Sequence, residues 1–513
     1  MSGVAEILFR MRVKGVRLWS ECGQLRYQSR AGSITPADLE CLQARKAELV
    51  AFLEQSRTSS PQEPVPAPRA GGLRVPLAFS QIWWWNCFDL GNRHTSRTIA
   101  GTVRISGPLN IAILQRSFRE LVHRHEALRT TIITIDNERW QQIEPRSAYE
   151  LPCFDLSSLP GSDQRREIER LTEEIVYEPV SLGRGPLFAA RLLKLGAGDY
   201  LAIAALDHII SDATSLDILW REILSGYTQL LTNEHLPPPK TRLQFSDYAM
   251  WLHQTNQWWT ERHGAYWSER LASARRIYLH LDTGIVSPAT AKWQIEPVQL
   301  GRRLSADLLE LSRREHTTLV MTLLTVYVAL LLRWSKQTEL IVPMVTMGRP
   351  YPQVYDSIGF FSTPLYLRAV LRDDDRFGDL LRRVTREHAD ASEHYDACRI
   401  AAQTPLPEFA WNPLFNWVPQ ELNARPAESL CPPCAQSGIR VEQQRLEVMP
   451  RDQIRWDREL ALRLSDTPEG VVGFFEHRIE HEHANLHKFV LGFVRVAELA
   501  VTESDRRLSA QSY

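Results

Sequence analysis

The sequence predicts a mixed α/β protein with at least two core-bearing units, in which a small N-terminal unit is followed by a larger body. Three observations support this prediction. The chain has 513 residues, whereas a single core rarely grows beyond about 250–300 residues. A stretch rich in proline and serine, residues 56–73, separates residues 1–55 from the rest. Beyond it, strand-like and helix-like segments alternate to the end of the chain.

Composition and charge exclude several classes of protein. Hydrophobic residues make up 44% of the chain and charged residues 24%, which is typical of a globular protein. The formal net charge is −1, so bulk charge predicts neither nucleic-acid nor membrane binding. Seven scattered cysteines and the absence of a signal-peptide pattern favour a cytoplasmic protein. The apolar run 318–332 is too short to cross a bilayer and predicts a buried helix.

The N-terminal unit, residues 1–55, reads as an opening helix to about residue 12, a β-hairpin and a second helix. Two alternating segments, 16–19 and 25–28, flank a loop that contains glycine, which is typical of a hairpin. Thr35, Pro36 and Asp38 then form a helix start, and leucines recur at helical spacing to about residue 55. Residues 56–73 are predicted to be a flexible linker.

One segment of the larger body combines a buried strand, a turn and a helix. The apolar run 200–206 is short enough to be a strand. Thr214 to Asp217 matches a capping box, and the apolar residues after it fall on one helical face. Residues 207–213 are therefore expected to form the turn between them. Proline-rich 236–240 and the Gly- and Pro-containing stretch 282–296 bracket a region that could link two halves of this body.

This turn carries the strongest candidate for chemistry, because His208 and Asp212 lie four residues apart in it. An imidazole is suited to base catalysis near neutral pH, and the aspartate could hold the turn by pairing with an arginine. A histidine at a strand end is more often a hydrogen-bonded structural residue. The turn alone therefore leaves both interpretations open.

Six motifs in order give this body a family resemblance. Residues 207–215 resemble the HHxxxDGxS motif of condensation domains from nonribosomal peptide synthetases. The other five segments similar to that family's motifs are Leu77–Trp83, Arg124–Thr130 (RHExLRT), Phe245–Trp251, Ile358–Phe361 and Asn412–Phe415.

The resemblance implies two chloramphenicol-acetyltransferase-like lobes in a V-shaped pseudodimer, residues 74–285 and 286–513, with one site at their junction. It implies transfer of an acyl chain from a carrier-protein thioester to an amine or hydroxyl. By position, His208 matches the catalytic histidine and Asp212 the structural acid, which we expect to pair with Arg349. Asp207, Ala213 and Ser215 complete the motif at the site.

Three residues depart from the family pattern. Asp207 replaces the first histidine, Ala213 replaces glycine, and Ser362-Thr-Pro replaces the usual VNT after Phe361. Ala213 cannot easily adopt a positive φ and adds a methyl group, so acceptor access could differ. Asp207 could make His208 a stronger base if their side chains approach. All three leave His208 in place.

Residues 1–55 are similar to β-hairpin docking domains of such assembly lines, which implies capture of the C-terminal tail of an upstream carrier protein. An exposed hairpin edge can accept an extended peptide as an added strand. The residues expected to contact an acidic tail are Lys14, Arg17, Trp19, Arg26 and Arg30. A solvated basic face is the alternative interpretation.

The remaining expectations concern partners and cofactors. The chain shows no phosphopantetheine-attachment motif and no room for an adenylation domain, so it is expected to act in trans, with no cofactor of its own. The phosphopantetheine arm comes from the carrier, and the acceptor is a free amine or alcohol. We expect a monomer without a metal site, and interpret Cys431, Cys434 and the histidines from His477 to His487 as non-ligating. Two alternatives are an epimerisation-type relative and a non-catalytic carrier-recruiting module.

Overall fold

A computed structural model gives the arrangement of most of the chain. The described residues are 7, 11, 16–21, 24–28, 36–51, 64–88, 98–146, 149–177, 181–232, 243–279, 292–401, 409, 412–418, 439–444, 460–479, 484–503 and 508. The predicted boundary between the lobes, residues 285 and 286, lies outside these residues.

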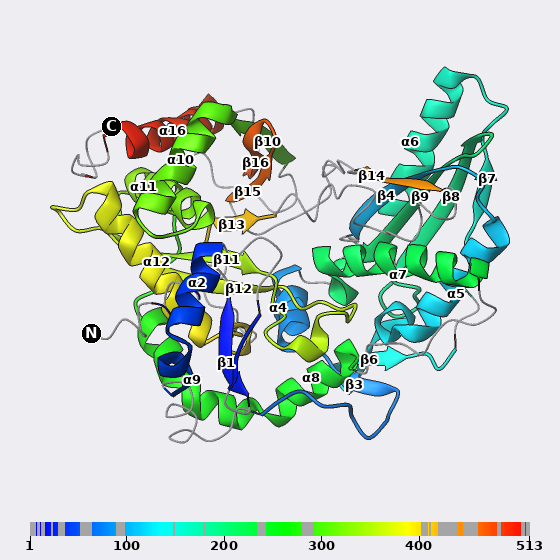
Figure 1. Ribbon diagram of the computed structural model, residues 1–513, viewed down its shortest axis with the longest axis horizontal. Helices are drawn as coiled ribbons and strands as arrows, with labels where there is room; N and C mark the ends of the chain where they lie inside the picture. The colour runs from blue at the N-terminus through cyan, green and yellow to red at the C-terminus, as the bar shows by residue number, and fades with distance from the viewer. Residues whose placement is uncertain are drawn as a thin grey trace.

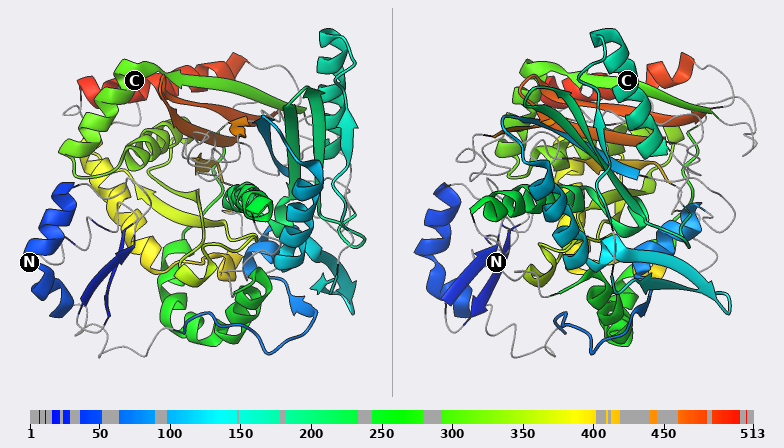
Figure 2. Two further views of the ribbon diagram at one scale, coloured as in Figure 1. Left: turned by 45° about the vertical axis from the view of Figure 1, so that its right-hand side comes forward. Right: turned by 90° about the vertical axis from the view of Figure 1, so that its right-hand side faces the viewer.

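The N-terminal unit contains the predicted hairpin and helix. Strands β1 (Arg17–Glu21) and β2 (Gln24–Gln28) pair antiparallel, with Glu21 opposite Gln24, and α2 spans Pro36–Ala44. A turn at Arg45 interrupts the expected helix before residues 46–51 continue it. The unit has a small core of its own, formed by Ile7, Met11, Val16, Leu42 and Leu49. Figures 1 and 2 show it beside the larger body.

The first half of the body is built on a five-stranded sheet in the order β14-β4-β9-β8-β7 and a three-stranded sheet in the order β3-β6-β5. Its strands are β3 (Arg74–Pro76), β4 (Thr98–Ser106), β5 (Thr130–Ile135), β6 (Glu138–Ile143), β7 (Cys153–Asp155), β8 (Phe188–Gly196) and β9 (Asp199–Asp207). Its helices are α4 (Phe79–Phe88), α5 (Ile111–Arg124), η1 (Glu126–Arg129), α6 (Gly161–Tyr177), η2 (His208–Ile210), α7 (Ala213–Thr232), α8 (Phe245–Gln254) and α9 (Asn256–Leu271).

Strand β9 confirms the strand predicted from the apolar run, and its burial on both faces explains the composition. Ala202, Ala204 and Leu206 belong to the main core, whereas Leu201 and Ile203 pack in a second core with residues of α6. Successive side chains of a strand point to opposite faces, so a strand covered on both sides is apolar throughout.

The second half is built on a six-stranded sheet in the order β10-β16-β15-β13-β11-β12. Its strands are β10 (Lys292–Leu300), β11 (Glu339–Thr346), β12 (Thr363–Val370), β13 (Leu414–Trp417), β15 (Leu460–Thr467) and β16 (Gly470–Ile479). Its helices are α10 (Gly301–Arg314), α11 (Leu319–Ser335), η3 (Pro352–Val354), α12 (Phe377–Glu393), α13 (Cys398–Ala401) and α16 (Ala484–Thr502). Helix α11 is the predicted buried helix. β10 begins at Lys292, inside the Gly- and Pro-containing stretch 282–296, and the region bracketed by the two predicted stretches contains α8 and α9.

One strand from the second half of the chain joins the five-stranded sheet of the first half. β14 (Arg440–Gln444) comes late in the chain but pairs antiparallel with β4 of the first sheet, with Arg440 opposite Ser106. Figure 1 shows β14 beside β4, away from the second sheet, while α4 and α8 join the two groups below. The prediction of a second lobe over residues 286–513 did not anticipate that a strand of this range would join the first sheet.

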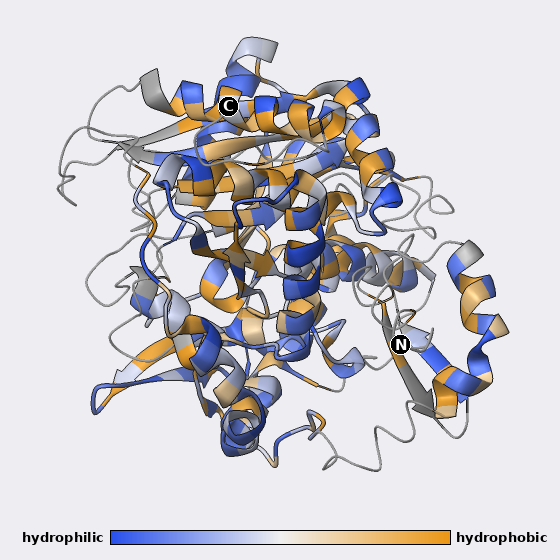
Figure 3. Cartoon of the chain, turned by 90° about the vertical axis from the view of Figure 1, so that its left-hand side faces the viewer, coloured by the Kyte–Doolittle hydropathy of each residue, from blue (hydrophilic) through white to orange (hydrophobic). Residues whose placement is uncertain are grey.

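Burial along the helices follows their sequence pattern. In Figure 3, hydrophilic and hydrophobic segments alternate along the helices of the face shown, as expected where one side of a helix packs on a core. Within the described residues, no single helix is long and apolar enough to span a membrane; the pair Gly301–Arg314 and Leu319–Ser335 passes that test only together, across a 103° bend.

Candidate active site

The His208 turn is closed by hydrogen bonds among its own residues. At the end of β9, the buried Asp207 carboxylate accepts from the Ile209 amide at 2.9 Å, and Ser211 Oγ donates to the Asp207 carbonyl at 2.9 Å. His208 Nδ1 lies 2.8 Å from the Ser211 carbonyl. The turn therefore orients the imidazole from one side.

This contact determines which ring nitrogen carries the proton. A carbonyl oxygen only accepts, so Nδ1 is the protonated nitrogen of His208. In the neutral imidazole, Nε2 then has the lone pair. The ring is half-buried and held in the tautomer that can accept a proton at Nε2.

Two aromatic rings from different halves of the chain pack on His208. The Trp84 ring, from α4, has its centroid 4.5 Å from that of the imidazole. The Phe360 ring, from the segment between η3 and β12, lies at 4.8 Å, edge to face. The imidazole thus lies at the junction of the two halves, as the family resemblance implied.

The predicted ion pair between Asp212 and Arg349 is present and almost fully buried. Arg349 Nη1 lies 2.7 Å from Asp212 Oδ2 and Nη2 lies 3.0 Å from Oδ1, with side-chain exposures of 6% and 1%. Asp212 also accepts from the Phe361 amide at 3.2 Å. Ser215 adds a third link, because its hydroxyl donates to Asp212 Oδ1 at 2.8 Å and lies 3.0 Å from the Gly359 carbonyl. Charge-assisted pairing of this kind gives the junction a fixed geometry.

Gly348 allows the Arg349 loop to approach the Phe361 segment closely. Its φ is +60°, and a Cβ built on it would lie 1.5 Å from the Phe361 carbonyl oxygen. Only glycine combines that backbone conformation with that contact.

Two polar residues of α4 attach this helix to the site, and their roles were not predicted. Ser80 Oγ donates to the Phe360 carbonyl at 2.8 Å, and Gln81 Nε2 donates to the Ile209 carbonyl at 2.8 Å. Gln81 also accepts from the Ala78 amide at 2.8 Å. The motif Leu77–Trp83 indicated that this segment belongs to the site, but the sequence alone did not predict a hydrogen-bond partner for Ser80 or Gln81.

The start of α7 corrects two expectations. The reciprocal cap lies between Asp212 and Ser215, whose amide donates to Asp212 Oδ1 at 2.8 Å, so the predicted box at Thr214–Asp217 is wrong by two residues. Ala213 is the first residue of the helix, is exposed, and has no positive φ. Its replacement of glycine therefore imposes no backbone strain on this turn.

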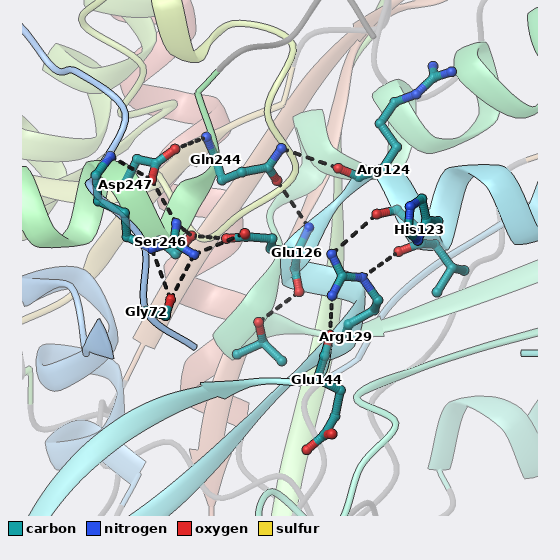
Figure 4. Close-up of polar contacts among 12 residues, drawn as sticks. Gly72, His123, Arg124, Glu126, Arg129, Glu144, Gln244, Ser246 and Asp247 are labelled. Carbon is teal, nitrogen blue, oxygen red and sulfur yellow. Dashed lines mark hydrogen bonds and ion pairs between the residues drawn. The ribbon is translucent and has the colours of Figure 1, made fainter. Parts of the chain in front are cut away.

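The RHExLRT motif meets the end of the linker in a buried polar cluster, drawn in Figure 4. Arg69 pairs with Glu126 at 2.9 Å and with Asp247 at 2.7 Å, and its side chain is 10% exposed. Burial alone would lower the pKa of Arg69, but these two carboxylates outweigh burial and raise it. The prediction of a flexible linker through residue 73 is therefore wrong for its last part.

Some of the predicted docking residues, and of the cysteines and histidines interpreted as non-ligating, lie within the described residues. Arg26 is exposed in β2, Arg17 and Trp19 lie in β1, and Lys14 and Arg30 lie outside the described residues, as do Cys431 and Cys434. His477 is buried in β16, while His487 Nδ1 lies 2.7 Å from Glu296. Among residues that the structure describes, no group of three or more His, Cys, Asp or Glu side chains could hold a metal ion.

Comparison with known families matches both units of the chain. The model for "Condensation domain" matches residues 74–420, and the model for "TubC N-terminal docking domain" matches residues 4–55.

Relatives in sequence agree with these matches along most of the chain. The chain is 28% identical over 476 residues to one of the subunits of linear gramicidin synthase from Brevibacillus parabrevis, which covers 90% of this chain and 6% of the relative. It spans 6% to 9% of the length of the three gramicidin synthase subunits that it matches.

Two solved structures establish the fold. The X-domain from teicoplanin biosynthesis superposes with a TM-score of 0.74 at 20% identity, covering 88% of this chain and all of that one. The EpoB NRPS cyclization-docking bidomain from Sorangium cellulosum superposes with a TM-score of 0.67 at 20% identity, covering 98% of each. The predicted fold class, paired chloramphenicol-acetyltransferase-like lobes behind a docking domain, is confirmed.

Proposed function

Because this chain belongs to the condensation-domain family and carries a docking domain of the TubC type, we propose that it is an acyltransferase of a nonribosomal peptide or polyketide assembly line. An acyl chain arrives as a thioester on the phosphopantetheine arm of a carrier protein. The amine or hydroxyl of an acceptor attacks the thioester carbonyl. The acyl–sulfur bond breaks, an amide or ester bond forms, and the carrier regains a thiol.

The observation that carries this proposal is the His208 imidazole, held in the Nδ1-protonated tautomer at the junction of the halves. Nε2 can take the proton that the acceptor loses as it attacks, and the resulting imidazolium can return a proton to the leaving thiolate. A hydroxyl is less nucleophilic than a neutral amine at pH 7, so an alcohol acceptor depends more on this base. Asp212 and Arg349 keep the turn in place without taking part in proton transfer.

We propose that the enzyme acts in trans on a free amine or alcohol, so that condensation releases the acyl chain as an amide or ester. The exposed hairpin of the N-terminal unit supports a role in capturing the C-terminal tail of the upstream carrier protein. Binding of the tail would raise the effective concentration of the loaded carrier at the site.

The first test replaces His208 with alanine. With acyl-loaded carrier and a panel of amines and alcohols, intact mass spectrometry measures the loss of the acyl group from the carrier. We expect condensation to slow by at least about 100-fold, because general-base catalysis contributes that much or more. A folded His208→Ala protein that condenses as fast as the parent would exclude the proposed mechanism. Exchange of an α-hydrogen into deuterated water without acceptor would instead identify an epimerase.

The second test deletes residues 1–55. At low carrier concentration, we expect the truncated protein to turn over several-fold more slowly than the full chain. At saturating carrier the two rates converge, because docking raises the local concentration of the carrier and leaves the active site unchanged. Equal rates at low carrier would show that the N-terminal unit does not dock this carrier.

A further inference from the structure

We propose that Trp84 is a positioning residue for His208, and that its indole preferentially stabilises the imidazolium form of that ring. This inference rests on the proposed function, in which His208 takes a proton from the acceptor. It gives a role to one residue of the Trp83–Trp85 run.

The three rings form one cluster. Trp84 lies 4.5 Å from His208 with an interplanar angle of 48°, and Phe360 lies 4.8 Å from His208 at 60°. Trp84 and Phe360 also contact each other, edge to face, at 5.4 Å. Both are buried, with exposures of 4% and 2%. The imidazole therefore has two aromatic neighbours and the Ser211 carbonyl at Nδ1.

The position of Trp84 is fixed by the helix that carries it. Ser80 attaches α4 to the carbonyl of Phe360, and Gln81 attaches it to the turn of His208 through the Ile209 carbonyl. Gln81 is fully buried. All three rings are thus held by one hydrogen-bonded framework, so the contact does not depend on side-chain packing alone.

The face of an aromatic ring attracts a cation, and indole does so most strongly among protein side chains. His208 has no net ring charge before it accepts the acceptor's proton and a positive charge afterwards. An attraction that grows as this charge develops lowers the energy of the state that follows proton transfer. The same rings exclude water, which acts in the opposite direction. Leucine at position 84 would keep much of this burial and remove the π system, so it separates the two effects.

The experiment measures carbethoxylation of His208 by diethyl pyrocarbonate against pH, with the modified peptides quantified by mass spectrometry. The reagent reacts with neutral imidazole, so the midpoint of the profile reports protonation and needs no substrate. The full-length parent is compared with Trp84→Leu and Trp84→Phe. Trp85→Leu is the matched control, because Trp85 is similarly buried on the same helix but stacks with Arg139, at 4.7 Å. Exposed His123 serves as an internal reference.

We expect Trp84→Leu to move the His208 midpoint about half a pH unit lower, and Trp84→Phe to move it less. Trp85→Leu should match the parent, and the His123 profile should be the same in all four proteins. The charged groups of the site, Asp207 and the paired Asp212 and Arg349, are unchanged in every variant. An unchanged or higher midpoint in Trp84→Leu would overturn the inference.

Condensation rates separate this inference from the proposed function. If His208→Ala condenses normally, His208 is not the general base, and the proposed mechanism fails whatever the Trp84→Leu profile shows. If His208→Ala is inactive while Trp84→Leu keeps the parent's profile and rate, only the inference fails. We expect Trp84→Leu to lower kcat about two- to five-fold, with a partial rescue in Trp84→Phe.

Discussion

Arg349 and Asp212 are the residues on which the junction most depends. Each is almost fully buried, and together with Ser215 they connect α7 to the segments around Gly348 and Phe361. The sequence predicted this pair from the family motif alone. Removing one partner leaves the other charge buried without compensation, which is far more costly than losing an exposed pair.

Arg349→Ala is therefore expected to lower the free energy of unfolding by about 3–5 kcal/mol. Denaturant-induced unfolding followed by circular dichroism measures this change. Arg221→Ala is the control, because Arg221 also bridges α7 to the second half, through Asp356 at 2.7 Å, but both side chains are exposed. The free energy of unfolding of Arg221→Ala should lie within about 1 kcal/mol of that of the parent. Equal losses in the two variants would contradict the central role given to the buried pair.

Asp207 and Ala213, two of the residues that differ from the family pattern, have different roles in the structure. Ala213 occupies an ordinary helical position without a positive φ, and its effect on acceptor access stays a prediction. Asp207 caps the turn through the Ile209 amide, a role that its motif position did not reveal. Its effect on the strength of His208 as a base stays a prediction.

Among the elements, helix α4 and the segment 64–73 have roles that their sequences did not indicate. The sequence marked α4 only as part of a family motif. Its tryptophans Trp83, Trp84 and Trp85 are buried, and Ser80 and Gln81 make the helix the connection between two loops of the site. The segment before it looked like unstructured linker, yet Arg69 holds it against η1 and α8. In both cases polar side chains with distant partners decide the position of the segment, Ser80 and Gln81 in α4 and Arg69 before it.

Arg69→Ala is expected to detach this segment, because Glu126 and Asp247 would face each other without a counter-ion. Limited digestion with a nonspecific protease should then cleave within residues 64–73 several-fold faster than in the parent. Arg74→Ala is the control, since Arg74 is exposed on β3. Cleavage at the parent's rate in Arg69→Ala would show that other contacts hold the segment.

At the scale of the whole molecule, contacts between distant segments hold the two halves together. β14 adds a strand from the second half to the first sheet. On the side of α9, His263 meets His394 at the end of α12, with their Nδ1 atoms 2.9 Å apart. Burial first, and then the neighbouring His394, lower the pKa of His263 to about 4. Burial also lowers the pKa of His394.

This histidine pair predicts acid sensitivity. The unfolded chain takes up a proton at His263 below about pH 6.5, its ordinary value, whereas the folded chain does so only near pH 4. The contribution of this residue to stability is therefore full above about pH 6.5 and is lost as the pH falls to about 4.

Urea midpoints between pH 7 and pH 4 measure this loss. Carboxylates also take up protons between pH 7 and pH 4 and so change the stability in the same pH range. The informative comparison is therefore with His263→Asn, because asparagine does not protonate. We expect its stability to depend less steeply on pH than that of the parent. Parallel curves for the two proteins would assign the acid sensitivity to other groups.

The sequence by itself determined much of the local structure and located the residues of the His208 turn. Periodicity and caps act between neighbours in the chain, so β9, α11, the hairpin and the start of α2 could be predicted from them, and ordered motifs located His208, Asp212 and Arg349. The tertiary structure decided which rings pack on His208, where Arg69 binds and which sheet receives β14. Ser80 and Phe360 are 280 positions apart, and contacts at such separations depend on how the finished elements pack, which no local pattern encodes.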